Sequence, residues 1–333
     1  MSVLLSPGHS PAQAQQAPST PQTPGAGRAA PVQPPRADSW RAIAAAYIGL
    51  TKPGIMVLLL ITTLAAALIA VREHPLPAPD IVRVLLATLV GGALASGGAA
   101  ALNCYIDRDI DAVMNRTRRR ALPTGTLQPR HALVFGLALN ALSVAILALL
   151  ANPLAAGLAL FGSFYYVVIY TMWLKRTTTQ NIVIGGGAGA VPPLVGWAAV
   201  TGAVALPPVI LFALIVLWTP AHFWSLALLT RKDYAAVNVP MLPAVAGVTY
   251  TKWRILAYTL LVVACSLSLY LIHAMGPIYL AAAVGLGGGF IYKAVGLLRE
   301  SGNSRARGTF MYSNLYLALI FFAMVIDRIV PLH

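Results

Sequence analysis

The stretch VRVLLATLVGGALASGGAAALNCYIDRDID, residues 82–111, decides the class of fold. Between Val84 and Ile106 it carries no charged side chain, and it is long enough to cross the hydrocarbon core of a bilayer as a helix. The apolar part of this stretch is 82–104, and eight more apolar stretches follow the same pattern: 53–72, 131–150, 154–173, 181–201, 207–229, 254–273, 277–297 and 309–331. The sequence therefore predicts an all-α membrane protein with nine transmembrane helices.

Composition excludes a soluble globular protein. Of the 333 residues, 58% are hydrophobic and only 10% are charged, against about 25% charged in ordinary soluble domains. The mean hydropathy is +0.76. A net charge of +14 would suggest nucleic acid in a soluble chain, but here the basic residues flank apolar spans. We expect membrane lipids and anionic substrates as partners, and no nucleic acid.

The basic residues also predict the topology. With nine spans, twenty of the 23 Lys and Arg residues fall on the side of the amino terminus, and only Arg72, Arg83 and Arg328 fall on the other. Because cytoplasmic loops carry the excess of Lys and Arg, the amino terminus is expected in the cytoplasm. The active site is expected at the same face.

Residues 1–38 differ from the rest of the chain. They contain eight of the 24 prolines, many Ala, Gln and Ser residues, and no apolar run long enough for a signal peptide. We expect a disordered Pro/Ala-rich cytoplasmic tail, followed by one nine-span membrane domain at 39–333. A bacterial inner membrane is favoured, and a mitochondrial origin stays open because the tail is poor in acids and contains arginine.

Acidic residues are scarce, so their positions are informative. Asn103, Asp107 and Asp111 are spaced at i, i+4 and i+8, on one stripe of a helix at the end of the second span. Two carboxylates and an amide oxygen form an oxygen-only ligand set that suits Mg²⁺. The alternative is that the acids only offset the arginines that follow, although charge balance does not require a single face. Asp233, after the sixth span, is expected at the same membrane face and is a candidate fourth ligand.

Basic side chains accompany both acidic loops. Candidates for binding a diphosphate and other substrate anions are Arg116, Lys175, Arg176 and Lys232. A role in topology alone is equally open for any single arginine. Acids, a metal and basic side chains beneath apolar helices together describe a site for a lipid diphosphate.

Several longer motifs carry a resemblance. LTKPGI at 50–55, KRTTTQNIVIGGGAGAVPPLVGW at 175–197, LWTPAHFW at 217–224, KDYAAVNVPMLP at 232–243 and FMYSNLYLALIFFAMVID at 310–327 occur in this order. With the Asn103, Asp107, Asp111 pattern, they resemble the UbiA superfamily of membrane prenyltransferases, and within it the protohaem IX farnesyltransferase (haem O synthase) branch. The match runs from about 48 to 328. KDY stands where much of the superfamily has a second DxxxD motif, which favours this branch.

The resemblance implies a UbiA-type helical bundle and a Mg²⁺-dependent reaction. Farnesyl from farnesyl diphosphate would be added, with water, to the C2 vinyl group of haem b, giving haem O and diphosphate. Haem b would be a substrate and not a cofactor. Haem A synthase and terminal oxidase assembly factors are the candidate protein partners.

The implied chemistry makes three further residues candidates for the site. His222 lies within an apolar span, where a histidine normally faces the protein interior; it could ligate haem iron, orient the water that is added, or bond a neighbouring helix. Tyr166 and Tyr170 share a helix face and could stabilise an allylic cation, but interfacial aromatic belts use the same residues.

Two other functions remain to be separated from this one. A prenyltransferase acting on an aromatic or quinone precursor would use the same acids. A transporter would also have many spans, but transporters place buried charge near the midplane of the bilayer, whereas here the acids cluster at one end of the spans.

Overall fold

A computed structural model describes residues 40–299 and 303–330, and every regular element in this part of the chain is helical. The tail predicted for 1–38 lies outside these residues. The elements are α1 (Trp40–Leu50), α2 (Pro53–Glu73), α3 (Ala78–Ile106), α4 (Arg108–Val113), α5 (Pro129–Leu150), α6 (Pro153–Phe164), the π-helix η1 (Tyr165–Leu174), α7 (Lys175–Thr177), α8 (Asn181–Thr201), α9 (Leu206–Leu229), α10 (Arg231–Ala236), α11 (Leu242–Val245), α12 (Val248–Leu271), α13 (Pro277–Arg299) and α14 (Asn303–Ile329).

The nine predicted spans are confirmed. Within the described ranges, nine helical segments are long and apolar enough to cross a membrane: α2, α3, α5, the continuous segment Pro153–Thr177, α8, α9, α12, α13 and α14. Three of them begin four to six residues before the predicted apolar stretches, since α3 starts at Ala78, α12 at Val248 and α14 at Asn303. Hydropathy detects the apolar part of a span, whereas backbone hydrogen bonding continues into its polar ends.

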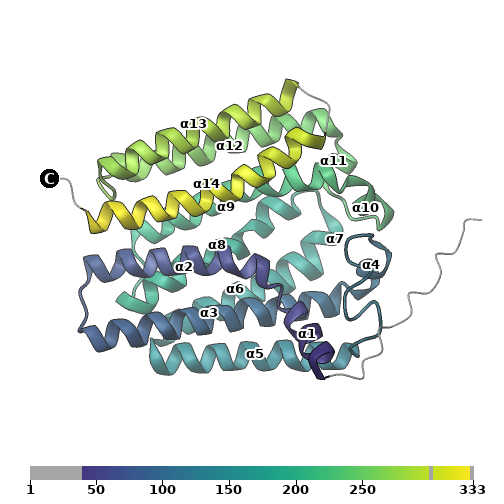
Figure 1. The fold of residues 1–333 in the computed structure, drawn as a ribbon, viewed down its shortest axis with the longest axis horizontal. Coiled ribbons are helices and arrows are strands. Elements are labelled where there is room, and N and C mark those ends of the chain that lie inside the picture. The colour runs from purple at the N-terminus through teal and green to yellow at the C-terminus, as the bar shows by residue number, and fades with distance from the viewer. Residues whose placement is uncertain (1–39, 300–302, 331–333) are drawn as a thin grey trace, which may run out of the picture. The chain divides into compact units, whose positions relative to one another are not determined.

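The short helices gather at one end of the long ones. Figure 1 shows α1, α4, α7, α10 and α11 at the right-hand end of the spans. Lys52, Asp107, Lys175 and Tyr234 belong to these connections, and we call this end of the spans the site end. The opposite, far end carries the tight turns, such as those before α3 and α6.

Small residues let the central spans approach closely. A Cβ added to Gly98 of α3 would lie 2.8 Å from the carbonyl oxygen of Gly136 in α5, and the reciprocal distance is 2.9 Å. A Cβ on Gly196 of α8 would lie 2.1 Å from the carbonyl oxygen of Thr63 in α2. Such backbone approach drives helix association in lipid, where apolar side chains gain little by leaving the bilayer. These close approaches allow α8, the most buried span, to pack against α2, α6 and α9.

At the far end, the last span, α14, is bonded to α13 and α2 through two adjacent side chains. Asp327 of α14 is buried, and its carboxylate accepts the backbone N–H groups of Gly276 and Tyr279 at the start of α13. The next residue, Arg328, pairs with Glu73 at the end of α2 at 2.7 Å. α14 also packs along α9 and α2.

Candidate active site

The acid stripe is intact although its helix is interrupted. Asp107 separates α3 from α4, yet its N–H still donates to Asn103 O at 2.9 Å, and the N–H of Asp111 donates to Asp107 O at 2.8 Å. The i to i+4 spacing is therefore preserved through the break. Asn103, Asp107 and Asp111 are all buried, with exposed fractions of 2–4%. As predicted, the three side chains share one face at the end of the second span.

Three side chains orient the amide of Asn103. Its Nδ2 donates to Asp107 Oδ2 at 2.7 Å and to Thr171 Oγ1 at 3.0 Å. Its Oδ1 accepts from the ammonium of Lys52, the residue that precedes α2. The Thr171 hydroxyl donates its own proton to Tyr166 O at 2.8 Å, so it can only accept from Asn103. Every polar atom of this amide is paired, and its orientation follows from the network.

Each acid of the stripe has a basic partner. Lys175 Nζ lies 2.5 Å from Asp107 Oδ2, and Arg120 NH1 lies 2.8 Å from Asp111 Oδ2. The other oxygen of Asp107, Oδ1, is buried and has no hydrogen-bond partner among the described residues; the nearest cation is Arg176, 3.6 Å away. Burial lowers the pKa of Lys52, and the charges of Asp111 and Asp107 partly oppose this fall. The site thus combines buried carboxylates with closely packed cations.

Arg176 holds the acidic loop from outside. It donates to both carboxylate oxygens of Asp109, each at 2.7 Å, and to the carbonyl oxygen of Ile106. This bidentate bond lowers the pKa of Asp109 to about 2, against the opposing effect of partial burial. Asp109 is exposed and points away from the stripe. Arg176 therefore binds the exposed acid of this loop, whereas Lys175 binds the buried Asp107.

The predicted aromatic pair lies on a π-helix. The rings of Tyr166 and Tyr170 stack at 5.6 Å between centroids, with an interplanar angle of 25°. Tyr170 faces α8 and not the lipid, because a Cβ on Gly185 would lie 2.3 Å from its ring. An interfacial belt does not explain Tyr170. Wide π turns occur most often at functional sites, and here the turn brings Thr171 and Lys175 to the acids.

The second acidic loop lies beside the first. Asp233 of α10 accepts from Asn115 Nδ2 at 3.3 Å, a contact that joins α10 to the loop after α4. Burial raises the pKa of the neighbouring Tyr234 phenol, and the positive charge of Arg116 partly offsets the rise. Lys232 and Arg116 are exposed. The structure brings Asp233 to the loop that follows the stripe, and it records no contact between Asp233 and the three stripe side chains.

His222 is held between α9 and α14 by ring contacts and one hydrogen bond. Its ring stacks on Trp218 at 4.2 Å and lies 4.8 Å from Phe310 of α14. Its Nδ1 is 2.8 Å from Ser313 Oγ. Since Ser313 donates its proton to the Phe310 carbonyl oxygen, it accepts from Nδ1–H, and Nε2 keeps its lone pair. His222 lies seven residues before the site end of α9, about 10 Å along the helix.

Sequence reasoning missed three polar residues at this end, Lys52, Thr171 and Asn181, and did not separate Arg120 from the other arginines of its loop. Lys52, Arg120 and Thr171 contact the stripe directly. Asn181, the first residue of α8, is fully buried, and neither atom of its amide has a partner in the described part of the chain. It lies on the same face of α8 as Gly185, where Tyr170 packs. The sequence did offer a signal for Asn181, because an amide side chain within a predicted apolar span is unusual.

The arrangement matches a known family. The sequence profile of the UbiA prenyltransferase family covers residues 59–320, most of the chain. The chain belongs to the UbiA prenyltransferase family. This membership confirms the resemblance found in the motifs, and it makes the protein a multi-pass membrane enzyme and not a transporter.

The chain is also similar in sequence to individual proteins of one name. The chain is 53% identical over 298 residues to the protoheme IX farnesyltransferase of Synechocystis sp., covering 89% of this chain and 93% of that protein. It is 52% identical over 292 residues to the protein of the same name in Chloroflexus aurantiacus, covering 88% of this chain but only 49% of that protein. The chain thus spans about half the length of the Chloroflexus relative.

Solved structures confirm the fold. A structure of digeranylgeranylglyceryl phosphate synthase superposes with a TM-score of 0.69 at 20% identity, covering 86% of this chain and 98% of that one. A UbiA homologue from Archaeoglobus fulgidus, bound to DMAPP and Mg²⁺, superposes with a TM-score of 0.60 at 15% identity, covering 84% and 98%. The predicted nine-helix UbiA-type bundle is confirmed.

The residues of the stripe fit a magnesium ion. No group of three or more His, Cys, Asp or Glu side chains with metal-ligand geometry occurs between residues 40 and 299 or 303 and 330. Mg²⁺ needs fewer protein ligands, however, because it keeps waters and shares substrate phosphate oxygens. The buried Oδ1 of Asp107 has no hydrogen-bond partner, and Asp111 follows one turn later. Burying a carboxylate oxygen without a hydrogen bond is energetically unfavourable, and Mg²⁺ at Asp107 Oδ1 would satisfy this oxygen.

Proposed function

We propose that this chain is a protohaem IX farnesyltransferase, which transfers farnesyl from farnesyl diphosphate to the C2 vinyl group of haem b with addition of water. The observation that carries the proposal is the buried stripe of Asn103, Asp107 and Asp111, with cations on each acid. The curated relatives at 52–53% identity that carry this name support it.

The chain's own residues bind and orient the diphosphate. Mg²⁺, held by Asp107 and Asp111 with Asn103 and Asp233 in support, would withdraw charge from the leaving oxygen. Lys52, just before α2, contacts Asn103, and Lys175 of α7 contacts Asp107. Arg116, Arg176 and Lys232 are the further candidates for binding the diphosphate. Fixed cations at a leaving anion stabilise the charge that develops when the C–O bond breaks.

The bond changes need no protein nucleophile. The C–O bond of farnesyl diphosphate breaks, and its electron pair leaves with the diphosphate. The vinyl π electrons form the new C–C bond, and water adds to the resulting cation with loss of a proton. Tyr166 and Tyr170 stack beside the stripe, where their ring faces can stabilise an allylic cation.

His222 is suited to hold the haem. Its protonated Nδ1 and free Nε2 form the tautomer that ligates iron, with Ser313 fixing the ring from behind. Stacking between Trp218 and Phe310 prevents rotation. We propose that Nε2 would ligate the iron of the haem substrate.

We propose that the site end of the protein lies in the cytoplasm. The excess of basic residues at this end supports that orientation, and the similarity to bacterial relatives favours a bacterial inner membrane. Farnesyl diphosphate and haem b are the substrates, while haem A synthase and oxidase assembly factors are the proposed protein partners.

The test is a haem product assay. The purified protein is incubated with haem b, farnesyl diphosphate and Mg²⁺, and haem mass is followed by chromatography. We expect a gain of one farnesyl group and one water, lost in Asp107→Asn and retained in Asp80→Asn, a matched change at an exposed acid of the far end. Farnesylation of a hydroxybenzoate instead of haem would overturn the acceptor, and no prenylation at all would overturn the function.

A further inference from the structure

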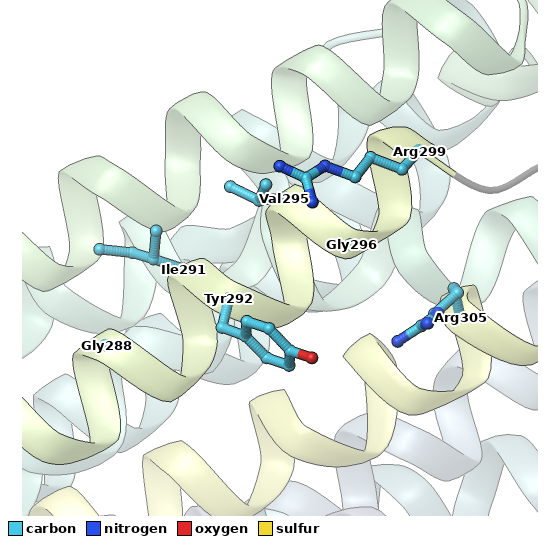
Figure 2. A pocket seen from close by; sticks show the side chains of 7 residues that line it. All are labelled: Gly288, Ile291, Tyr292, Val295, Gly296, Arg299 and Arg305. Atoms are coloured by element: carbon cyan, nitrogen blue, oxygen red, sulfur yellow. The ribbon is translucent and has the colours of Figure 1, made fainter.

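A groove lies between α13 and α14, apart from the candidate active site. It has a volume of about 530 Å³. Apolar residues of α13, among them Ile291 and Val295, line its inner part, and two arginines, Arg299 and Arg305, line its site-end part. Figure 2 shows the guanidinium groups of both arginines beside this stretch of α13. The acidic stripe and η1 contribute nothing to it.

The helices bring the two arginines to the same membrane face. α13 runs toward the site end and finishes at Arg299, while α14 starts there at Asn303 and runs back. Gly296 leaves room between them, because the nearest atom to a Cβ at that position is Arg305 NH1, 3.7 Å away. The phenol of Tyr292 points toward the same guanidinium (Figure 2).

We propose that this groove binds the headgroup and upper acyl chain of an anionic phospholipid from the leaflet at the site end. Arginine pairs well with phosphate oxygens, and basic pockets between transmembrane helices bind anionic lipid headgroups. The apolar inner part fits an acyl chain, which a free phosphate ion lacks. α13 packs mainly against α12 and α14, so this side of it faces lipid. The proposal does not rest on the proposed catalytic function.

Lipid binding to the purified full chain tests this directly. The protein in detergent is titrated with phosphatidylglycerol, and bound lipid is counted by native mass spectrometry. The double variant Arg299→Gln, Arg305→Gln should bind about 25-fold more weakly, since each arginine near an anionic surface contributes about five-fold. The matched control, Arg130→Gln with Arg254→Gln, removes the same charge elsewhere at the site end and should bind as the wild type does.

A second variant tests the shape of the groove. Gly296→Leu keeps both arginines but fills the space beneath them, so phosphatidylglycerol should again be lost. Three results would overturn the proposal: equal binding by wild type and either groove variant, equal loss in the charge control, or equal affinity for phosphatidylcholine. Displacement of the lipid by millimolar inorganic phosphate or by farnesyl diphosphate would overturn the assignment to a phospholipid.

Discussion

The hydroxyl of Thr171 offers the sharpest test of how the acid stripe is held. This side chain is fully buried; it accepts a hydrogen bond from Asn103 and donates one to the carbonyl oxygen of Tyr166. Thr171→Val keeps the size and branching of the side chain and removes both bonds. Asn103 then keeps its bond to Asp107, but one hydrogen of its amide has no partner, at a cost of about 1–3 kcal/mol.

We expect this cost to appear in metal binding. The Mg²⁺ concentration that gives half-maximal haem product should rise about ten-fold, within the range of about 10- to 100-fold typical for the outer partners of metal ligands. Binding of Mn²⁺ in the presence of farnesyl diphosphate, followed by electron paramagnetic resonance, gives a readout independent of turnover. Thr171→Ser restores the hydroxyl and should recover the metal affinity. Wild-type Mg²⁺ and Mn²⁺ dependence in the Val variant, or a Ser variant as weak as Val, would refute the reasoning.

Two further substitutions test the packing and the haem assignment. Gly196→Ala places a methyl group against the carbonyl oxygen of Thr63, and it should destabilise the protein by about 1–3 kcal/mol in thermal unfolding. The control is Gly189→Ala in the same helix, because a Cβ at Gly189 meets nothing within 4 Å. Equal melting temperatures for the two variants would contradict the close contact at Gly196. Ser313→Ala leaves Nδ1 of His222 without its acceptor, and a haem titration should show about three- to ten-fold weaker binding with an altered absorption spectrum. Unchanged affinity and spectrum would remove His222 as the iron ligand.

The spans and the acid stripe were predictable because both are local patterns. An apolar stretch of about 20 residues becomes a membrane helix almost regardless of its neighbours. The i, i+4, i+8 spacing of Asn103, Asp107 and Asp111 survives the break at Asp107 because the backbone hydrogen bonds continue across it.

Contacts between distant helices were not predictable in this way. Lys52 meets Asn103 across 51 residues, and Thr171 meets it across 68. Neither residue is unusual in its own segment, since a lysine before a span is normal and a threonine in a helix is common. The π-helix was missed as well, because its wide turns depend on packing against α8 and leave no periodic signal. Without that turn, the position of Tyr170 against Gly185 could not be distinguished from a membrane interface.

The ion pairs at the stripe influence the order in which ligands arrive. Asp107, Asp109 and Asp111 pair with Lys175, Arg176 and Arg120, and the ammonium of Lys52 adds a further positive charge at Asn103. A bare dication would have to compete with ammonium and guanidinium groups already in contact with the acids. Magnesium already complexed to a diphosphate has a net negative charge, so it gives the displaced cations phosphate oxygens to bind in exchange. The site is therefore built to admit the metal and the prenyl donor together, and free magnesium alone should bind it poorly.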